Sequence, residues 1–360
     1  MKRQPKHDNS RPGQRSPVSE DQIIERLRRS GARRDRAAGL GLGVGDDAAL
    51  FSPRSGFETV LTCDWFLEGT HFLRDKHPAD AIGWKCLARA VSDIAAMGGT
   101  PRCFLLGLAL PTTHTSTWLD GFLSGLRRAQ RRLGCALAGG DTSKSNRILI
   151  QVTVIGEVRN GKAVLRSGAK PGDIVFVSGR LGEAELGLRR LRYQKRIDPA
   201  DPALRKHLYP EPRLRLGSWL AANQLATAML DLSDGLSTDL ARLCAASGVG
   251  ARIEAARLPL PTKAGNRVNL SDLALHGGDD YELLFTVSPK KIQRIPEYLG
   301  TLPLTKIGTI TRSRGLRFSD TEGSEHLLNS SGWDPFRTKN GLVQSTFRPR
   351  PAPYCPQPDA

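Results

Sequence analysis

The chain has 360 residues, of which 39% are hydrophobic and 25% charged, a composition typical of globular proteins with one or two domains. It contains no run of roughly 18 apolar residues and opens with polar and basic residues, which argues against a membrane protein and a secretory signal. We therefore expect a cytoplasmic protein. Its 53 lysines and arginines exceed its 36 acidic residues, which gives a net charge of +17 and favours partners that carry phosphate.

The excess positive charge is concentrated near the two ends of the chain. Residues 1–36 and 337–360 together carry 9 of the 17 net charges. Because residues 1–17 and 337–360 hold little that can be buried, we predict that both segments are disordered basic tails. A nucleic-acid-binding protein is an alternative, but it predicts a basic folded face with interleaved aromatic residues, and aromatic residues make up only 6%. We expect at most weak nucleic-acid contacts from the tails.

The cysteines do not indicate a metal site or a disulfide framework. No C-x-x-C spacing occurs, and five of the six lie in apolar or amphipathic runs that look like core. Cys63 has no identifiable base as a partner, so it is not predicted to be a nucleophile. We expect reduced thiols.

The first part of the chain alternates strand and helix patterns and predicts an α/β domain over residues 18–160. A helix begins near Ser19 and precedes a glycine-rich opening segment. The strands are expected at 59–64, 103–110, 135–141 and 148–158, and the helices between them at 79–97 and 118–133.

A change in composition near residue 160 predicts a second α/β domain over residues 161–336. A polar turn at 166–173 leads into a strand at 174–178, and a helix is expected to begin within Tyr209–Arg213. Further strands are expected at 228–231, 251–255, 283–287, 302–312 and 316–318, with a helix from 233 to 248.

Aspartates repeatedly follow apolar, strand-like runs. The first pair, Asp46 and Asp47, stands in the segment Gly43–Leu50 with no basic residue nearby, and for this motif alone a polar turn is the better interpretation. The recurrence changes that assessment, because hard oxygen ligands at the ends of rigid elements suit Mg²⁺, which bridges to phosphate oxygens. The recurring positions are Asp46, Asp64, Asp93, Asp141, Asp231 and Asp234.

Asp93 differs from the others because it lies within a predicted helix. It falls among Ala90, Ala95 and Ala96 on a small, apolar face. A carboxylate there is costly without a partner, which favours a metal-binding role over an exposed surface position.

The motifs, taken together and in order, resemble those of thiamine-monophosphate kinases. They are Gly-Val-Gly-Asp-Asp-Ala-Ala-Leu at 43, Thr-Cys-Asp at 62, Val-Ser-Asp-Ile-Ala-Ala-Met-Gly-Gly at 91, Gly-Gly-Asp-Thr at 139, Arg-Ser-Gly-Ala-Lys-Pro-Gly-Asp at 166, Leu-Asp-Leu-Ser-Asp-Gly-Leu at 230 and Gly-Gly-Asp-Asp-Tyr-Glu-Leu at 277. The match extends from about Asp21 to Phe336. These kinases belong to a superfamily that also includes aminoimidazole ribonucleotide synthetase and selenophosphate synthetase.

The resemblance implies a two-domain PurM-like α/β (α+β) fold and a homodimer in which N-terminal mixed sheets form a barrel-like interface beside a C-terminal α/β domain. It implies ATP-dependent, Mg²⁺-assisted direct transfer of a phosphoryl group to thiamine monophosphate, which yields thiamine diphosphate. No P-loop or protein-kinase motif is present, so carboxylate-held magnesium is expected to neutralise much of the phosphate charge.

The resemblance also assigns residues to roles. Those that look like ligands of several Mg²⁺ ions are Asp46, Thr62, Cys63, Asp64, Asp93, Asp141, Asp231 and Asp234. Those expected to be essential for catalysis are Asp46, Asp93, Asp141 and Asp231. Gly140, Asp141, Arg166 and Ser233 look like ATP contacts, and His71, Asp279 and Trp333 look like contacts to thiamine phosphate.

Two positions depart from the family pattern. Cys63 stands where threonine is more common, and Asp279 replaces a glutamate, which shortens its reach by one methylene group. Three alternatives stay open beside this interpretation: another ATP-dependent kinase or synthetase of the superfamily, a nucleic-acid-binding protein, and a non-catalytic relative.

Overall fold

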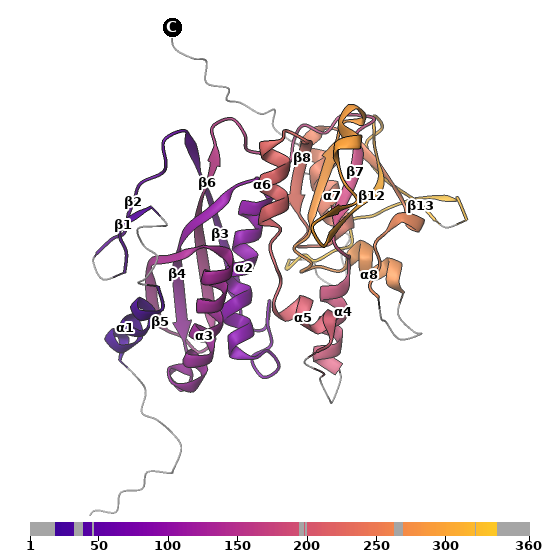
Figure 1. Cartoon of the computed structure of the whole chain (residues 1–360). Helices are drawn as coiled ribbons and strands as arrows, with labels where there is room; N and C mark the ends of the chain where they lie inside the picture. The colour runs from indigo at the N-terminus through magenta and orange to yellow at the C-terminus, as the bar shows by residue number, and fades with distance from the viewer. Residues whose placement is uncertain are drawn as a thin grey trace, which may run out of the picture.

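The computed structural model describes residues 19–31, 39–44, 47–193, 198, 200–262, 269–320 and 322–336. The expected tails at 1–17 and 337–360 and the candidate ligand Asp46 lie outside the described residues. Figure 1 shows two lobes side by side, the first half of the chain in indigo and purple and the second in magenta to yellow. Within the described part, no helix is long and apolar enough to cross a membrane.

The N-terminal lobe is built on a mixed four-stranded sheet with the order β3-β6-β4-β5. β4 and β5 are parallel and the other pairs are antiparallel, which confirms the expected mixed sheet. The strands are β3 (Phe57–Leu67), β4 (Thr100–Leu110), β5 (Ala136–Lys144) and β6 (Leu149–Arg159). Helix α1 (Glu20–Gly31) and the two-stranded pair β1 (Leu40–Leu42) and β2 (Leu50–Phe51) precede them.

Two helices, α2 (Ala79–Ala96) and α3 (Thr117–Leu133), cover one face of this sheet, with the short helix η1 (Thr112–His114) before α3. Glycines let them approach closely: a Cβ atom on Gly83 would lie 2.0 Å from the Phe122 oxygen, and one on Gly125 would lie 1.8 Å from the Asp80 oxygen. The other face of the sheet leaves Leu61 and Trp65 exposed at 68% and 55%.

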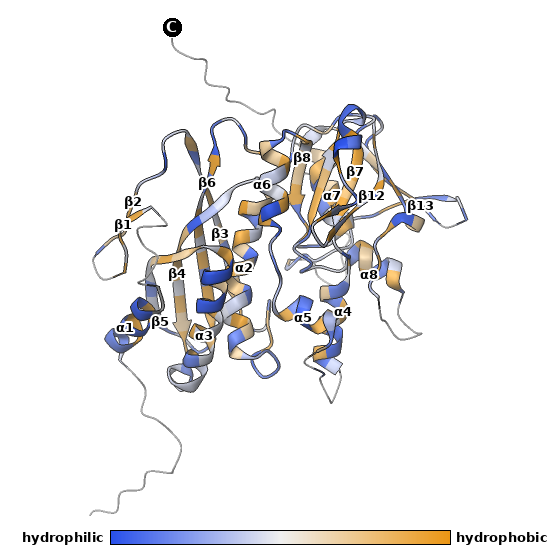
Figure 2. Cartoon of the chain, in the orientation of Figure 1, coloured by the Kyte–Doolittle hydropathy of each residue, from blue (hydrophilic) through white to orange (hydrophobic). Residues whose placement is uncertain are grey.

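The C-terminal lobe contains an eight-stranded sheet with the order β14-β13-β9-β12-β7-β10-β8 and β11 paired to β12. β13 runs parallel to β9, and the other neighbours are antiparallel. The strands are β7 (Ile174–Ser178), β8 (Ala226–Asp231), β9 (Gly250–Glu254), β10 (Leu283–Val287), β11 (Tyr298–Leu299), β12 (Leu302–Thr311), β13 (Gly315–Ser319) and β14 (Glu325–Leu327). Figure 2 shows hydrophobic residues in orange along β7 and β12, in the interior of this lobe.

The helices of this lobe pack on the sheet and against the N-terminal lobe. They are α4 (Glu183–Tyr193), α5 (Pro202–Leu208), α6 (Leu214–Ala222), α7 (Leu236–Ser247) and α8 (Leu270–His276), with the short helices η2 (Ala255–Arg257) and η3 (Pro289–Arg294). The helix expected to begin within Tyr209–Arg213 begins at Leu214 instead, because Pro210 and Pro212 disfavour helical geometry in the residues before them. The proposed domain boundary at residue 160 falls between β6 and β7.

Helix α2 forms the wall between the two lobes. Its far side meets α6, where a Cβ atom on Gly217 would lie 2.0 Å from the Ala95 oxygen. Lys85, Arg89 and Asp93 are spaced four residues apart along α2, so they share one stripe of the helix. This stripe faces the C-terminal lobe and carries the polar residues of the site described next.

Candidate functional site

A pocket of about 540 Å³ lies between the two lobes and is lined by residues from both. It brings together eight of the residues that the sequence selects: Asp64, His71, Asp93, Asp231, Ser233, Asp234, Asp279 and Trp333. We refer to it as the central pocket. These residues are up to 269 positions apart in the chain, so only the packing of one lobe on the other assembles them.

Three carboxylates from three elements meet in the central pocket. Asp64 comes from β3, Asp93 from α2, and Asp231 from the end of β8, where it is only 5% exposed. Burial raises the pKa of each, and the negative charge of Asp93 raises the pKa of Asp231 further. The hydroxyl group of Thr62 donates a hydrogen bond to Asp93, which partly offsets the shift there. Arg89 and Arg166 act on Asp64 or Asp93 only through space, and no ion pair joins a cation to any of the three carboxylates within the described part of the chain. The cluster is therefore suited to a bound cation.

The turn after β8 supplies Ser233 and Asp234. The carboxylate of Asp239 accepts hydrogen bonds from the backbone N–H groups of Asp234 and Gly235, at 3.0 and 3.1 Å, and so holds the turn. Arg242 forms an ion pair with Asp234 and with Asp239. One carboxylate oxygen of Asp234 is thus already occupied, whereas Asp231 has no ion-pair partner among the described residues.

Trp333 reaches the pocket because its segment is tied to the same turn. Its backbone N–H donates to the backbone carbonyl oxygen of Asp234 at 2.9 Å. The backbone N–H of Gly332 donates to the Thr238 hydroxyl oxygen at 3.0 Å. No side chain fits at position 332, since a Cβ atom there would lie 2.0 Å from the backbone carbonyl oxygen of Asp234. The indole is 44% exposed at the mouth of the pocket, where a planar, electron-rich face is available to an aromatic or cationic ligand.

His71 is held as a neutral hydrogen-bond donor. Its Nδ1 atom accepts a hydrogen bond from the Leu67 N–H at 3.0 Å, so the proton of the neutral ring is on Nε2. Burial, assisted by the charge of Arg89, lowers the pKa of His71 to about 4. The ring is therefore uncharged at neutral pH.

The segment Gly277–Glu282 alternates between the pocket and the interior of the C-terminal lobe. Asp279 and Tyr281 line the pocket, and both have positive φ angles, 67° and 50°. Backbone N–H groups of these two residues donate to the oxygens of Ser233 and Leu232, each at 2.8 Å, which holds the uncommon geometry in place.

Asp279 is already engaged on both carboxylate oxygens. It accepts from Lys85 Nζ at 2.9 Å and from the Tyr281 hydroxyl group at 2.7 Å. Burial alone would raise its pKa, but the ammonium of Lys85 and the guanidinium of Arg89 hold it well below its ordinary value. Asp279 is thus an ionised, oriented acceptor and also a bridge from the C-terminal lobe to α2.

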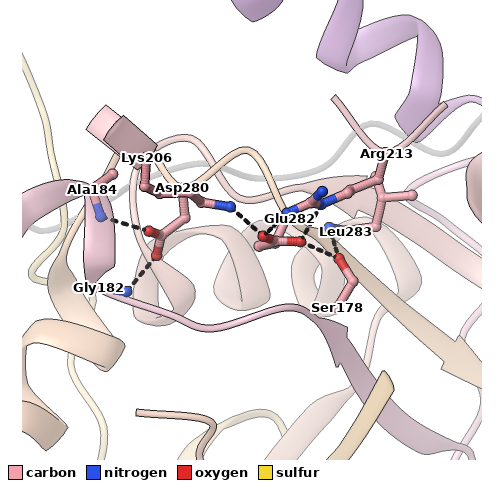
Figure 3. Close-up of polar contacts among 8 residues, drawn as sticks. All are labelled: Ser178, Gly182, Ala184, Lys206, Arg213, Asp280, Glu282 and Leu283. Carbon is pink, nitrogen blue, oxygen red and sulfur yellow. Dashed lines mark hydrogen bonds and ion pairs between the residues drawn. The ribbon is translucent and has the colours of Figure 1, made fainter. Parts of the chain in front are cut away.

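Asp280 and Glu282 point the other way and anchor the segment (Figure 3). Asp280 accepts hydrogen bonds from the backbone N–H groups of Gly182 and Ala184. Glu282 is paired with Lys206 and Arg213 and accepts from the Ser178 hydroxyl group at 2.6 Å. The two positive charges outweigh burial and lower the pKa of Glu282 to about 2.

A second pocket of about 470 Å³ lies on the other side of Asp93. Thr62, Asp93 and Arg166 line it together with apolar side chains that include Leu61 and Leu165. We refer to it as the lateral pocket. Asp93 lines both pockets, so it marks the point at which ligands in the two would meet.

Gly140 and Asp141 are not brought to either pocket in the single chain. They lie on β5 and line a third pocket of about 970 Å³, beside β1, β2 and α1, together with Asp47. The thiol group of Cys63 is also separate. Because side chains alternate along β3, it lies on the opposite face from Thr62 and Asp64, where Gln151 Nε2 approaches it at 2.8 Å.

Sequence reasoning missed several polar residues in and beside the central pocket. Lys85 is 1% exposed and contacts His207 Nδ1 at 3.3 Å in addition to Asp279, and His207 contacts His77 at 3.0 Å between Nε2 atoms. Arg89 lines the pocket as well. The available signal was the spacing of Lys85, Arg89 and Asp93, which places charged residues on one stripe of an otherwise apolar helix.

The donor groups of the central pocket fit magnesium, although they do not form a closed cage. Among the described residues, no three histidine, cysteine or acidic side chains are close enough together to enclose a metal ion. Mg²⁺ at phosphoryl-transfer sites is held by one or two carboxylates, with substrate phosphates and water completing its shell. The open set formed by Asp64, Asp93 and Asp231 is of that kind.

Comparisons with known proteins agree with this architecture. Two family models match, AIR synthase related protein N-terminal domain over residues 45–158 and its C-terminal domain over residues 170–321. The thiamine-monophosphate kinase of Synechococcus elongatus is 38% identical over 302 residues, which cover 82% of this chain and 91% of that protein. The enzyme of that name from Escherichia coli K12 is 37% identical over 306 residues, covering 82% and 92%.

Solved structures of related proteins have the same fold. The thiamine-monophosphate kinase of Stenotrophomonas maltophilia superposes with a TM-score of 0.75 and 36% identity, covering 84% of this chain and 96% of that one. A structure described as AaThiL complexed with AMPPCP and TMP has a TM-score of 0.69 and 31% identity, covering 87% and 96%.

Proposed function

The chain belongs to the thiamine-monophosphate kinase family, within the AIR synthase related proteins, and from that premise we propose that it transfers the terminal phosphoryl group of ATP to thiamine phosphate, giving thiamine diphosphate and ADP. The observation that carries the proposal is the position of Asp93, which lines both the central and the lateral pocket. Two ligands whose phosphates meet at this carboxylate are placed for direct transfer.

We assign thiamine phosphate to the central pocket. Trp333 offers a face to the thiazolium or pyrimidine ring, His71 offers the Nε2–H group, and Asp279 offers an ionised acceptor. ATP is assigned to the lateral pocket, where Arg166 is available to its phosphates and Leu165 to its base. Ser233, in the turn beside Asp231, lines the central pocket from the other lobe, where its hydroxyl group is available to a transferred phosphoryl group.

In the transfer, an oxygen of thiamine phosphate bonds to the terminal phosphorus of ATP as the bond from that phosphorus to the bridging oxygen of ADP breaks. A phosphate oxygen is already ionised at pH 7, so the chain needs no strong general base. Its task is to align two anions that repel each other. Bound magnesium would neutralise phosphate charge, held by Asp64, Asp93 and Asp231 with Thr62 and Asp234 beside them.

An ADP-release assay with the purified chain, ATP and Mg²⁺ tests the proposal. We expect turnover with thiamine phosphate, and background rates with thiamine and with buffer alone. Chelation of the magnesium with EDTA should abolish turnover. Turnover with none of the thiamine compounds would contradict the proposal and leave another kinase or synthetase reaction of the superfamily.

We also propose a homodimer in which the open faces of two N-terminal sheets pair into a closed barrel. The exposure of Leu61 and Trp65 supports a covered face, and closure removes the free edges of the sheet. β3 and β5 are the two edges of the sheet. A two-fold axis along the barrel would place β3 of one subunit beside β5 of the other. We propose this pairing, which would bring Asp141 of the partner subunit to the site of Asp64.

Mixing two inactive variants tests this arrangement. Asp93→Asn and Asp141→Asn should each be inactive alone. Dimers that contain one chain of each would have one site with both substitutions and one with neither, so co-expression should restore up to about a quarter of wild-type activity. Mixed dimers that form and stay inactive would show that both residues act from the same chain.

A further inference from the structure

Arg89 is a charged residue of the central pocket without a partner for its charge. It lies on α2, one turn before Asp93, and its side chain lines the pocket. The Nε atom is buried and has no hydrogen-bond partner, and within the described part of the chain the guanidinium forms no ion pair within 4.0 Å. The guanidinium lies over the ring of Phe66, with its Cζ atom 5.1 Å from the ring centroid.

The neighbouring cations, unlike Arg89, form ion pairs with carboxylates. Lys85, one turn earlier, pairs with Asp279 at 2.9 Å, and Arg242 pairs with both Asp234 and Asp239. The carboxylates whose charge acts on Arg89 include Asp279, Asp64 and Asp234. Lys85 and Arg242 already pair with Asp279 and Asp234, and Asp64 forms no ion pair with Arg89. A guanidinium kept inside a pocket without a direct partner is costly unless a ligand anion completes it.

The position of Arg89 specifies the anion. It lines the central pocket together with Asp64 of the carboxylate cluster and with His71 and Asp279, which are assigned to the thiamine end. The phosphate of an acceptor bound in this pocket must connect the thiamine end to the carboxylate cluster, so it lies in the same pocket as the guanidinium. The lateral pocket has its own arginine, Arg166, for the donor phosphates. A planar guanidinium matches two phosphate oxygens in a bidentate fashion.

We propose that Arg89 binds the phosphate group of the acceptor and thereby makes the site select a phosphorylated acceptor over its alcohol form. This inference rests on the proposed function and deepens it, because the pocket would otherwise present that phosphate mainly with carboxylates, which repel it. The residue is a specificity determinant because it places a cation inside the pocket, whereas Arg192, the other arginine of the pocket lining, is exposed.

Kinetics of Arg89→Met test the inference. Loss of a bidentate, charge-assisted contact should lower kcat/KM for thiamine phosphate by roughly 30- to 100-fold. The KM for ATP should stay within about threefold of wild type, because the donor phosphates have a separate arginine. Arg166→Met provides the matched contrast and should raise the KM for ATP instead. Arg205→Met, on the exposed side of α5, removes the same charge outside the pockets and should behave as wild type.

Calorimetric titration with thiamine phosphate in the absence of ATP gives a readout that does not need turnover. Binding should weaken in Arg89→Met to the affinity that both proteins have for thiamine. Arg89→Lys keeps the charge without the planar fork and should show an intermediate loss, which preserves the test if the methionine variant does not fold.

These measurements test the proposed function and the role of Arg89 separately. A wild-type protein that neither binds nor phosphorylates thiamine phosphate would overturn the proposed function. A wild-type protein that does both, with Arg89→Met equal to it, would overturn the role of Arg89 alone. A rise in the KM for ATP with binding of thiamine phosphate unchanged would assign Arg89 to the donor and also overturn the inference.

Discussion

Replacement of Asp231 by asparagine should abolish phosphoryl transfer and at the same time stabilise the ligand-free protein. The carboxylate is 5% exposed, and its pKa is raised by burial and by the negative charge of Asp93. The ionised form is therefore unfavourable in the folded chain at neutral pH, and an amide of the same shape removes that cost. We expect a gain of about 1–3 kcal/mol in the free energy of unfolding and a loss of about 10³-fold in kcat.

The pH dependence of stability tests whether the raised pKa of Asp231 destabilises the folded protein. A carboxyl group whose pKa is raised in the folded state binds more protons there than in the unfolded chain. Its contribution therefore lowers stability as the pH rises from its ordinary pKa, 3.8, through the raised value. Thermal unfolding of the wild type without ligands should show this decline, and Asp231→Asn should show less of it.

Ligand addition and a surface control complete this experiment. Mg²⁺ with ATP should raise the unfolding temperature of the wild type and have little effect on Asp231→Asn. Asp75→Asn, at a side chain that is 91% exposed, should leave activity and stability unchanged. An Asp231→Asn protein that is destabilised, or that keeps full activity, would show that Asp231 is structural.

Replacement of Glu282 by alanine should produce the largest loss of stability of any single change considered. Its carboxylate is 1% exposed and neutralises Lys206 and Arg213, whose side chains are 12% and 19% exposed (Figure 3). Removing it leaves two cations at an interior position without an anion. We expect a loss of about 3–5 kcal/mol, measured by denaturant unfolding.

The dependence of stability on pH below 4.5 also tests the role of Glu282. The pKa of Glu282 is lowered from 4.5 to about 2, so its contribution is complete above pH 4.5 and disappears as the pH falls from 4.5 to 2. Glu282→Gln should flatten this part of the profile. Asp75→Asn, which removes a carboxylate on a side chain that is 91% exposed, is the control for a general effect of charge. Equal stability of Glu282→Ala and wild type would refute the anchoring role.

Much of the architecture follows from local patterns. Apolar runs and helical spacing are short-range properties, so the strand at 59–64 and the helix at 79–97 are found as β3 and α2 with shifted ends. The short helices α4, α5 and α8 were not predicted, because seven to eleven residues provide little periodicity. The displaced start of α6 shows how prolines set a boundary that a helical pattern alone misplaces.

What the sequence by itself determined is the identity and order of the motifs, the family that they resemble, and the presence of many carboxylates after strands. These properties depend on residue types and spacing. They place Asp231 at the end of β8 and Asp93 within α2 without reference to any other element.

Only the tertiary structure decided which of those residues meet. The packing of α2 against the C-terminal lobe joins Asp93 to Asp231, turns Arg89 toward the same pocket, and leaves Asp141 at the far edge of its sheet. The alternation of β3 directs the thiol of Cys63 away from Asp64. The physical reason is that contact and burial depend on distances between elements remote in sequence, whereas a motif specifies only its own neighbours.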